Sequence, residues 1–150
     1  MTAQAAEKLI YKGEQFSLCN EPLGSFIQSN RLPFKFEVTS TALWRGYIGT
    51  WTIEQERLYL IAIQGSIGME KLFPGFAHGV FAHWYTGTLR CPQGALLKYV
   101  HGGFGSVYEE DLFLDVSKGV MANERLVRNS TAAPDASKGY ILAAATSIGD

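Results

Sequence analysis

The chain has 150 residues and a formal net charge of −1, with a sequence pI near 6.3. Its length suits one domain, and its hydrophobic content of 47% excludes an intrinsically disordered chain. The near-neutral charge argues against a nucleic-acid-binding protein, and the sequence has no run of about 20 apolar residues that would span a membrane.

The first part of the chain predicts three short strands and a turn-rich segment. Residues 9–11 and 16–18 are expected to pair, because Gly13 between them can take the positive φ of a tight turn. Residues 20–33 are rich in turn-forming residues and are expected to hold at most one helical turn. Residues 34–38 alternate aromatic and charged side chains, which predicts a half-buried strand.

Residues 42–63 predict a long β-hairpin. Two runs rich in β-branched and aromatic residues flank a charged break, and neither run contains proline. In the first arm Arg45, Tyr47, Trp51 and Ile53 fall on one face, while the other face also carries large apolar groups. Apolar groups on both faces indicate a strand that is central in its sheet or closed into a barrel.

The rest of the chain continues with strands and turns. A short helix is expected at residues 69–73, since Pro74 and Gly75 would end it. Further strands are expected at residues 80–89, 96–100, 107–116 and 120–127. The predicted connections are a turn at residues 91–94, a glycine-rich segment at residues 101–106, and a turn at residues 118–119.

About seven to ten strands with little helix predict a mainly β fold. We expect a single domain over residues 1–150, built as a strongly bent antiparallel sheet, a small barrel or a sandwich, with one or two short helices. Residues 129–139 are small and polar, as in a mobile, linker-like excursion. Residues 140–150 are expected to form a C-terminal docking segment.

Residues 44–119 contain three segments in a characteristic order. They are an aromatic hairpin, WRGYIGTWTIEQERLYL, a strand leading to a proline-glycine turn, WYTGTLRCPQG, and a glycine-rich connection with its following strand, YVHGGFGSVYEEDLFLDVSKG. Together they resemble small uncharacterised bacterial proteins that contain a domain of unknown function. The resemblance implies a bacterial, cytoplasmic protein of β fold, and it implies no activity and no catalytic residue.

The histidines and cysteines form no recognised catalytic or metal-binding motif. His78 and His83 would point to opposite faces of one strand, and the chain has no HxH or HExxH pair, so we expect no metal and no cofactor. Cys19 and Cys91 are too few for a secreted disulfide scaffold and are expected to be reduced thiols of a cytoplasmic protein. A hydrolase that uses Cys91 with a histidine is the third functional hypothesis.

Aromatic residues beside strand glycines give the leading hypothesis, a non-enzymatic domain that binds a small apolar or aromatic molecule on a concave, aromatic-lined face. The candidate ligand-binding residues are Arg45, Tyr47, Trp51, His83, Trp84 and Tyr85. Core packing is the alternative role for these rings. Arg45 would need a carboxylate or an anionic ligand if it were buried, and otherwise would reach the surface. The second functional hypothesis is a protein-interaction or self-associating module, such as an immunity-type or oligomeric protein.

Overall fold

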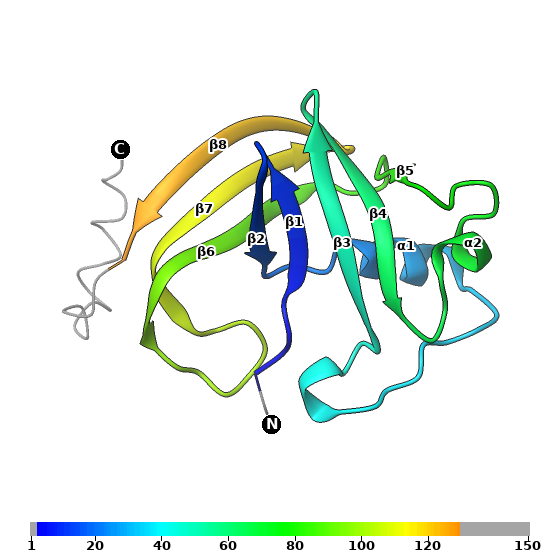
Figure 1. Ribbon diagram of the computed structural model, residues 1–150, viewed down its shortest axis with the longest axis horizontal. Coiled ribbons are helices and arrows are strands. Elements are labelled where there is room, and N and C mark those ends of the chain that lie inside the picture. Colours follow the sequence, from blue (N-terminus) through cyan, green and yellow to red (C-terminus); the bar gives the residue numbers. More distant parts are fainter. Residues whose placement is uncertain (1–2, 130–150) are drawn as a thin grey trace.

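One eight-stranded sheet carries about half of residues 3–129, the part of the chain that the computed structural model describes (Figure 1). The strands are β1 (Glu7–Tyr11), β2 (Glu14–Leu18), β3 (Tyr47–Glu54), β4 (Arg57–Gly65), β5 (Val80–Phe81), β6 (Gly87–Lys98), β7 (Val107–Ser117) and β8 (Val120–Arg128). Two α-helices, α1 (Pro22–Asn30) and α2 (Met69–Leu72), and one 3₁₀ turn, η1 (Thr41–Leu43), lie between strands.

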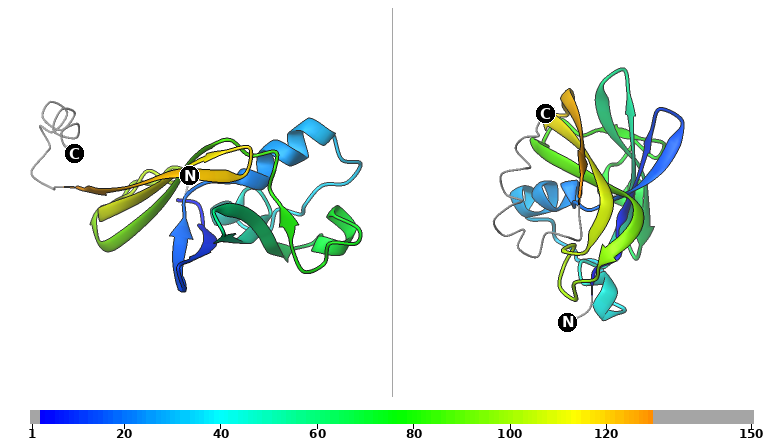
Figure 2. Two further views of the ribbon diagram at one scale, coloured as in Figure 1. Left: turned by 90° about the horizontal axis from the view of Figure 1, so that it is seen from above. Right: turned by 90° about the vertical axis from the view of Figure 1, so that its left-hand side faces the viewer.

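The strands follow the order β2-β1-β3-β4-β8-β7-β6, with β5 paired to β4. The sheet is strongly bent but not closed, although the two ends approach each other where the Cys19 N–H donates to the Arg90 carbonyl, at 2.9 Å. The β6–β7–β8 meander extends away from the other strands (Figure 2). The predicted mainly β, bent sheet is therefore confirmed for the described residues.

The β1–β3 pair departs from the antiparallel prediction, because these two strands run parallel. Parallel neighbours require a long connection, and here β2, α1 and η1 lie between the two strands in the chain. Its register sets Leu9 beside Trp51 and Lys8 beside Thr50, so that Glu7 falls at the level of Gly49.

Three hairpins are closed by two-residue turns, at Lys12-Gly13, Gln55-Glu56 and Lys118-Gly119. Both central residues of each turn have positive φ, which is the geometry that matches the twist of the flanking strands. Gly119 also lies where a Cβ would be 2.7 Å from the Ala82 carbonyl oxygen, so this turn requires glycine for space as well as for φ. The predicted hairpin over residues 42–63 and the strands near residues 107–128 are confirmed.

Other sequence predictions were wrong in detail. Helix α1 has nine residues rather than one turn, and Pro22 is accommodated in its first turn, where no backbone donor is needed. Residues 34–38 form no strand. Residues 91–94 lie inside β6 rather than in a turn, and Gly94, with φ of +84°, marks the irregularity at which the register to β7 shifts. The predicted strand at residues 80–89 is interrupted between β5 and β6.

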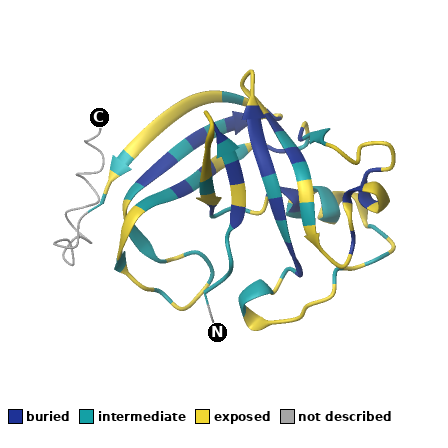
Figure 3. Ribbon diagram, in the orientation of Figure 1, coloured by how far each residue is buried: buried dark blue, intermediate teal, exposed yellow. Residues whose placement is uncertain are grey.

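The core lies on the inner side of the bent sheet. Figure 3 shows that buried positions are frequent in β3 and that most of β8 is exposed. The fully buried side chains include Trp51, Leu9, Leu58, Leu60, Leu89 and Leu114, and one of them, Glu7, is an acid. The fold therefore encloses a carboxylate among apolar groups.

Two parts of the sequence prediction concern the end of the chain. Asn129 belongs to the described residues, and its backbone N–H donates to the Glu109 carbonyl at 2.8 Å. The remainder of the predicted linker at residues 129–139, and the docking segment at residues 140–150, lie outside the described residues. Within residues 3–129, no helix is long and apolar enough to cross a membrane.

Tyr11 joins the end of β1 to β8 and makes the fold sensitive to alkaline pH. Its hydroxyl donates to the Glu124 carboxylate, and burial together with this bond raises the pKa of Tyr11 to about 12. Because an unfolded tyrosine titrates near pH 10, this stabilisation is fully present below about pH 10 and is lost as the pH rises towards about 12.

We therefore predict that Tyr11→Phe lowers the free energy of unfolding at pH 7 by about 1.5–3 kcal/mol, as expected for loss of a hydrogen bond to a charged group. The difference from the wild type should shrink as the pH rises from about 10 to about 12. Urea unfolding at pH 7 and at alkaline pH measures both effects, with the exposed Tyr99→Phe as control at pH 7. An unchanged difference at alkaline pH would contradict the assignment.

Candidate functional site

A fully buried carboxylate, Glu7, accepts four hydrogen bonds. Its Oε2 atom accepts from Arg45 Nε at 3.0 Å, from Arg45 Nη2 at 2.8 Å and from the Gly49 backbone N–H at 2.9 Å. Its Oε1 atom accepts from Trp51 Nε1 at 2.9 Å. Every one of these contacts is donated to the carboxylate, which suits the ionised form. We call these four residues the Glu7–Arg45 centre.

Glycine at position 49 allows the carboxylate to approach β3. A Cβ added there would lie 2.6 Å from Glu7 Oε1 and 2.8 Å from Trp51 Nε1, so any side chain would displace the acid or the indole. The same residue donates its backbone N–H to Glu7. A glycine inside a strand commonly marks such a close approach.

The pKa of the Glu7 carboxyl is set by opposing effects. Burial raises it above its ordinary value, while the bonds from Trp51 and Gly49 and the positive charge of Arg45 act to lower it. A buried carboxylate is costly unless it is paired and hydrogen-bonded, and here it has both a cation and two neutral donors.

Arg45 is buried as well, with only 7% of its side chain exposed. If buried, Arg45 was expected to need a carboxylate or an anionic ligand as its partner, and Glu7 supplies a carboxylate. Nη2 also donates to the Ala5 carbonyl at 2.9 Å. The guanidinium carbon lies 5.5 Å from the centre of the Tyr47 ring and 5.8 Å from the centre of the Phe104 ring. Both rings are close enough to stabilise the cation.

One nitrogen atom of this guanidinium makes no hydrogen bond within the described residues. Arg45 Nη1 is buried and has no hydrogen-bond partner among residues 3–129. A buried donor without a partner costs about 1–3 kcal/mol, and more when it carries charge. The centre therefore contains a donor group suited to an acceptor from outside the described chain.

Phe104 is held beside Arg45 by a second arginine. Arg90 donates to the Phe104 carbonyl at 2.6 Å and to the Ser106 carbonyl at 2.8 Å, and its Nε pairs with the buried Asp111 at 2.8 Å. From the other side, the Gln4 N–H donates to the Gly103 carbonyl at 2.9 Å. The glycine-rich connection at residues 101–106 is thus fixed at both flanks. Phe104 was noted among the aromatic residues of the sequence but was not one of the six predicted ligand-binding residues, although a single aromatic among three glycines was the available signal.

The predicted ligand-binding residues fall into separate groups. Arg45, Tyr47 and Trp51 come together around Glu7, and both rings are almost completely buried. Tyr85 is also buried, and its hydroxyl lies 2.6 Å from where a Cβ of Gly87 would be. Tyr47, Trp51 and Tyr85 therefore contribute to the core and not to an open face.

Trp84 belongs to a second aromatic group, formed with Phe26 of α1 and with Phe73, which directly follows α2. Its ring lies 4.9 Å from the Phe26 ring and stacks 5.7 Å from the Phe73 ring, and its indole N–H donates to the Pro22 carbonyl. The exposed His83 contacts the edge of this group. A contact of 6.5 Å between the Trp84 and Trp51 rings connects it to the Glu7–Arg45 centre.

The thiols lack the properties of nucleophiles. Cys91 is fully buried, and burial raises its pKa to about 12. Burial also raises the pKa of Cys19, and both cysteines are free. Because the thiolate is the reactive form, these environments do not support a cysteine hydrolase. In the described part of the chain, no group of three or more His, Cys, Asp or Glu side chains is placed to hold a metal ion.

No protein-family model, curated protein or solved structure matches the chain. Its chemistry must therefore be inferred from the geometry alone. The Glu7–Arg45 centre provides a fixed, buried hydrogen-bond donor beside two aromatic rings. Such an arrangement can bind and orient an acceptor group.

The two charges of this centre should be energetically coupled. Removing either partner leaves a buried charge unpaired, which costs about 3–5 kcal/mol. Removing both leaves no buried charge, although the single amide oxygen of glutamine can replace only one of the two carboxylate oxygens to which Trp51 and Gly49 donate. We predict that Glu7→Gln and Arg45→Met each lower the free energy of unfolding. The loss in the double variant should be smaller than the sum of the two single losses, and the difference, which is the coupling energy, should be about 1–3 kcal/mol.

Chemical denaturation of the four proteins measures this coupling. Where a single variant is too unstable to fold, the double variant should still fold and should be the more stable of the two. Additivity within about 0.5 kcal/mol would show that the pair is not coupled.

Proposed function

We propose that the protein is a non-enzymatic domain that binds a small molecule through the Glu7–Arg45 centre. The observation that carries the proposal is the unpartnered, buried Nη1 atom of Arg45. Arginine has five N–H donors, and three bonds to Glu7 and Ala5 engage Nε and Nη2, which leaves the two N–H groups of Nη1. These two donors point away from the carboxylate in a rigid, planar fork.

A ligand acceptor at Nη1 would satisfy the donor and lie near the Tyr47 and Phe104 rings. Binding sites for small molecules commonly combine apolar or aromatic walls with a few fixed polar groups, and the centre offers this combination. The donor is held in place before binding because Glu7 fixes the guanidinium through two bonds. A donor that is fixed in advance loses little conformational freedom when it binds.

The cellular setting belongs to the same proposal. Two free cysteines suit a reducing compartment, and the resemblance noted from the sequence is to bacterial proteins. We place the protein in the bacterial cytoplasm on these grounds.

Ring-bearing probes with different acceptors test this function. We predict that at least one of benzamide, acetophenone, benzoate and phenyl phosphate shifts the indole N–H signal of Trp51 in ¹H–¹⁵N spectra, because that group is bonded to Glu7. The Arg45→Lys variant keeps a positive charge for Glu7 but lacks Nη1, so the shift should disappear.

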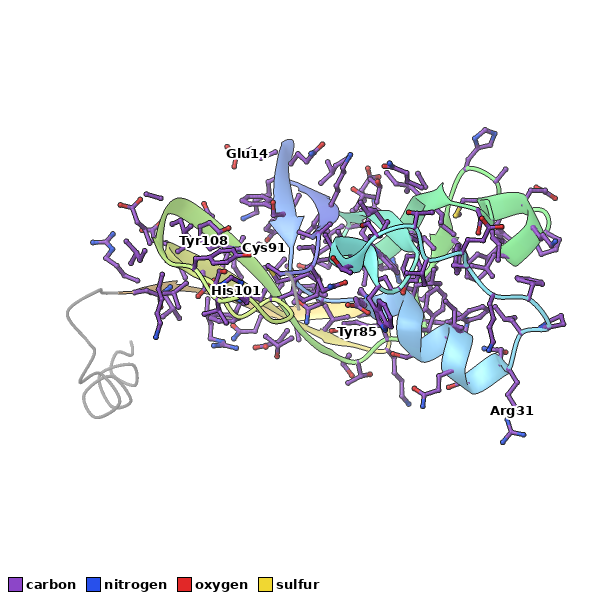
Figure 4. The ribbon with its side chains drawn as sticks, turned by 90° about the horizontal axis from the view of Figure 1, so that it is seen from below. Glu14, Arg31, Tyr85, Cys91, His101 and Tyr108 are labelled. Atoms are coloured by element: carbon purple, nitrogen blue, oxygen red, sulfur yellow. The ribbon has the colours of Figure 1, made fainter. Side chains whose placement is uncertain are left out.

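Arg31→Lys is the matched control, since Arg31 lies at the opposite end of the molecule from His101 in the glycine-rich connection (Figure 4). Its spectra should respond as the wild type does. If none of the four probes moves the Trp51 signal or raises the unfolding temperature of the wild type, the proposed function is wrong.

Self-association is the second candidate, and the outer edge of β8 favours it. Within residues 3–129, β8 pairs with β4 only at Arg57 and Val120, so most of its outer edge faces no strand. Leu126 on this strand is 57% exposed. Long edge strands with exposed apolar residues are templates for pairing with another copy.

We predict that, if this candidate is correct, light scattering after size-exclusion chromatography gives the mass of a dimer. Leu126→Lys should return the protein to the monomer, because lysine on an edge strand disfavours edge-to-edge pairing. A monomeric wild type at high concentration would rule out this candidate and leave the binding proposal unaffected.

A further inference from the structure

We propose that Arg45 Nη1 donates a hydrogen bond to a neutral ligand, namely to the carbonyl oxygen of an aromatic amide or ketone, in preference to a carboxylate or a phosphate. The inference rests on the proposed function and names the chemical class of its ligand. An unoccupied arginine donor would ordinarily suggest an anion, and three features of the centre argue against one.

The first feature is the charge balance. Two hydrogen bonds pair the Glu7 carboxyl with the Arg45 guanidinium, and as an ion pair the two groups carry no net charge. An anion at Nη1 would bring a second negative charge to one guanidinium in a buried place. Burying a charge is costly unless it has its own partner, whereas a carbonyl oxygen needs only the hydrogen bond.

The second feature is that the neighbouring cation, Arg90, already has a carboxylate partner. Arg90 is the other arginine that contacts the Phe104 segment, and it is paired with Asp111 and bonded to two carbonyl oxygens. Its charge is therefore already neutralised. No further cation in the described contacts of Tyr47 or Phe104 would balance an incoming anion.

The third feature is the pair of rings. The faces of Tyr47 and Phe104 carry partial negative charge, which attracts the guanidinium and repels an anion placed against them. A flat, neutral aromatic group can contact the half-buried Phe104 ring without this penalty.

Benzamide and benzoate provide the direct comparison, because they share size and ring and differ in charge. We expect the wild type at pH 7 to bind benzamide about tenfold or more tightly than benzoate, a ratio that corresponds to about 1.4 kcal/mol. Titration to the solubility limit, followed by the Trp51 indole signal, gives both dissociation constants.

The Glu7→Gln variant removes the negative charge that is paired with Arg45. With the carboxylate neutralised, Arg45 becomes an uncompensated cation, so the preference for benzamide should fall by about tenfold or invert in favour of benzoate. Arg31→Lys is again the control and should keep the wild-type ratio. If Glu7→Gln does not fold, the ratio measured on the wild type still decides the inference.

The possible failures are distinct. Benzoate binding to the wild type as tightly as benzamide, or more tightly, would overturn the neutral-ligand inference and leave the binding function intact. Equal binding of benzamide to wild type and Arg45→Lys would overturn the assignment to Nη1. Absence of binding by all four ring-bearing probes would overturn the proposed function itself.

Discussion

The carboxylate of Glu7 is the interaction on which the interior of this protein depends. It joins β1 to β3 through the Gly49 N–H, anchors the indole of Trp51, and holds Arg45 at the entrance to β3. The parallel register of β1 and β3 makes this possible, because it sets Glu7 at the level of Gly49. A shift of one residue would turn Glu7 to the opposite face of the sheet and bury Lys8 in its place.

A second pair, Arg90 with Asp111, extends this organisation. Arg90 donates hydrogen bonds to two carbonyl oxygens of the segment that carries Phe104, and the Phe104 ring lies beside Arg45. The two ion pairs are far apart in the chain, but both contact Phe104: Arg90 contacts its backbone and Arg45 contacts its ring. The environment of Arg45 is therefore determined both by the strand pairing near the N-terminus and by the connection between β6 and β7.

Local sequence patterns were sufficient for the elements that are stabilised locally. The β3–β4 and β7–β8 hairpins combine apolar runs with two-residue turns, and α2 ends where Pro74 and Gly75 require it. The pattern at residues 34–38 resembled a strand, but this segment finds no neighbouring strand to pair with. Alternation describes the side chains, whereas a strand also needs a partner for its backbone.

The site was harder to predict because its members are distant in sequence. Arg45 was recognised as a residue that needs an acidic partner, but Glu7 is 38 residues away and looks like an ordinary surface acid at the start of a strand. Its burial follows from the β1–β3 pairing, which sequence periodicity does not specify. The aromatic residues were correctly noted, yet whether a ring faces the core or the surface depends on the curvature of the whole sheet.

The remaining donor on Arg45 costs stability, and the proposed function rests on it. An apolar residue at this position would avoid the cost of an unpartnered guanidinium nitrogen, and replacement of buried ion pairs by apolar groups is often stabilising. Arg45 and Glu7 together give the interior a donor of the strength of a charged group without a net charge. A neutral acceptor can use that strength without bringing a charge into the core, and this is the physical reason to connect the pair with ligand binding and not with stability alone.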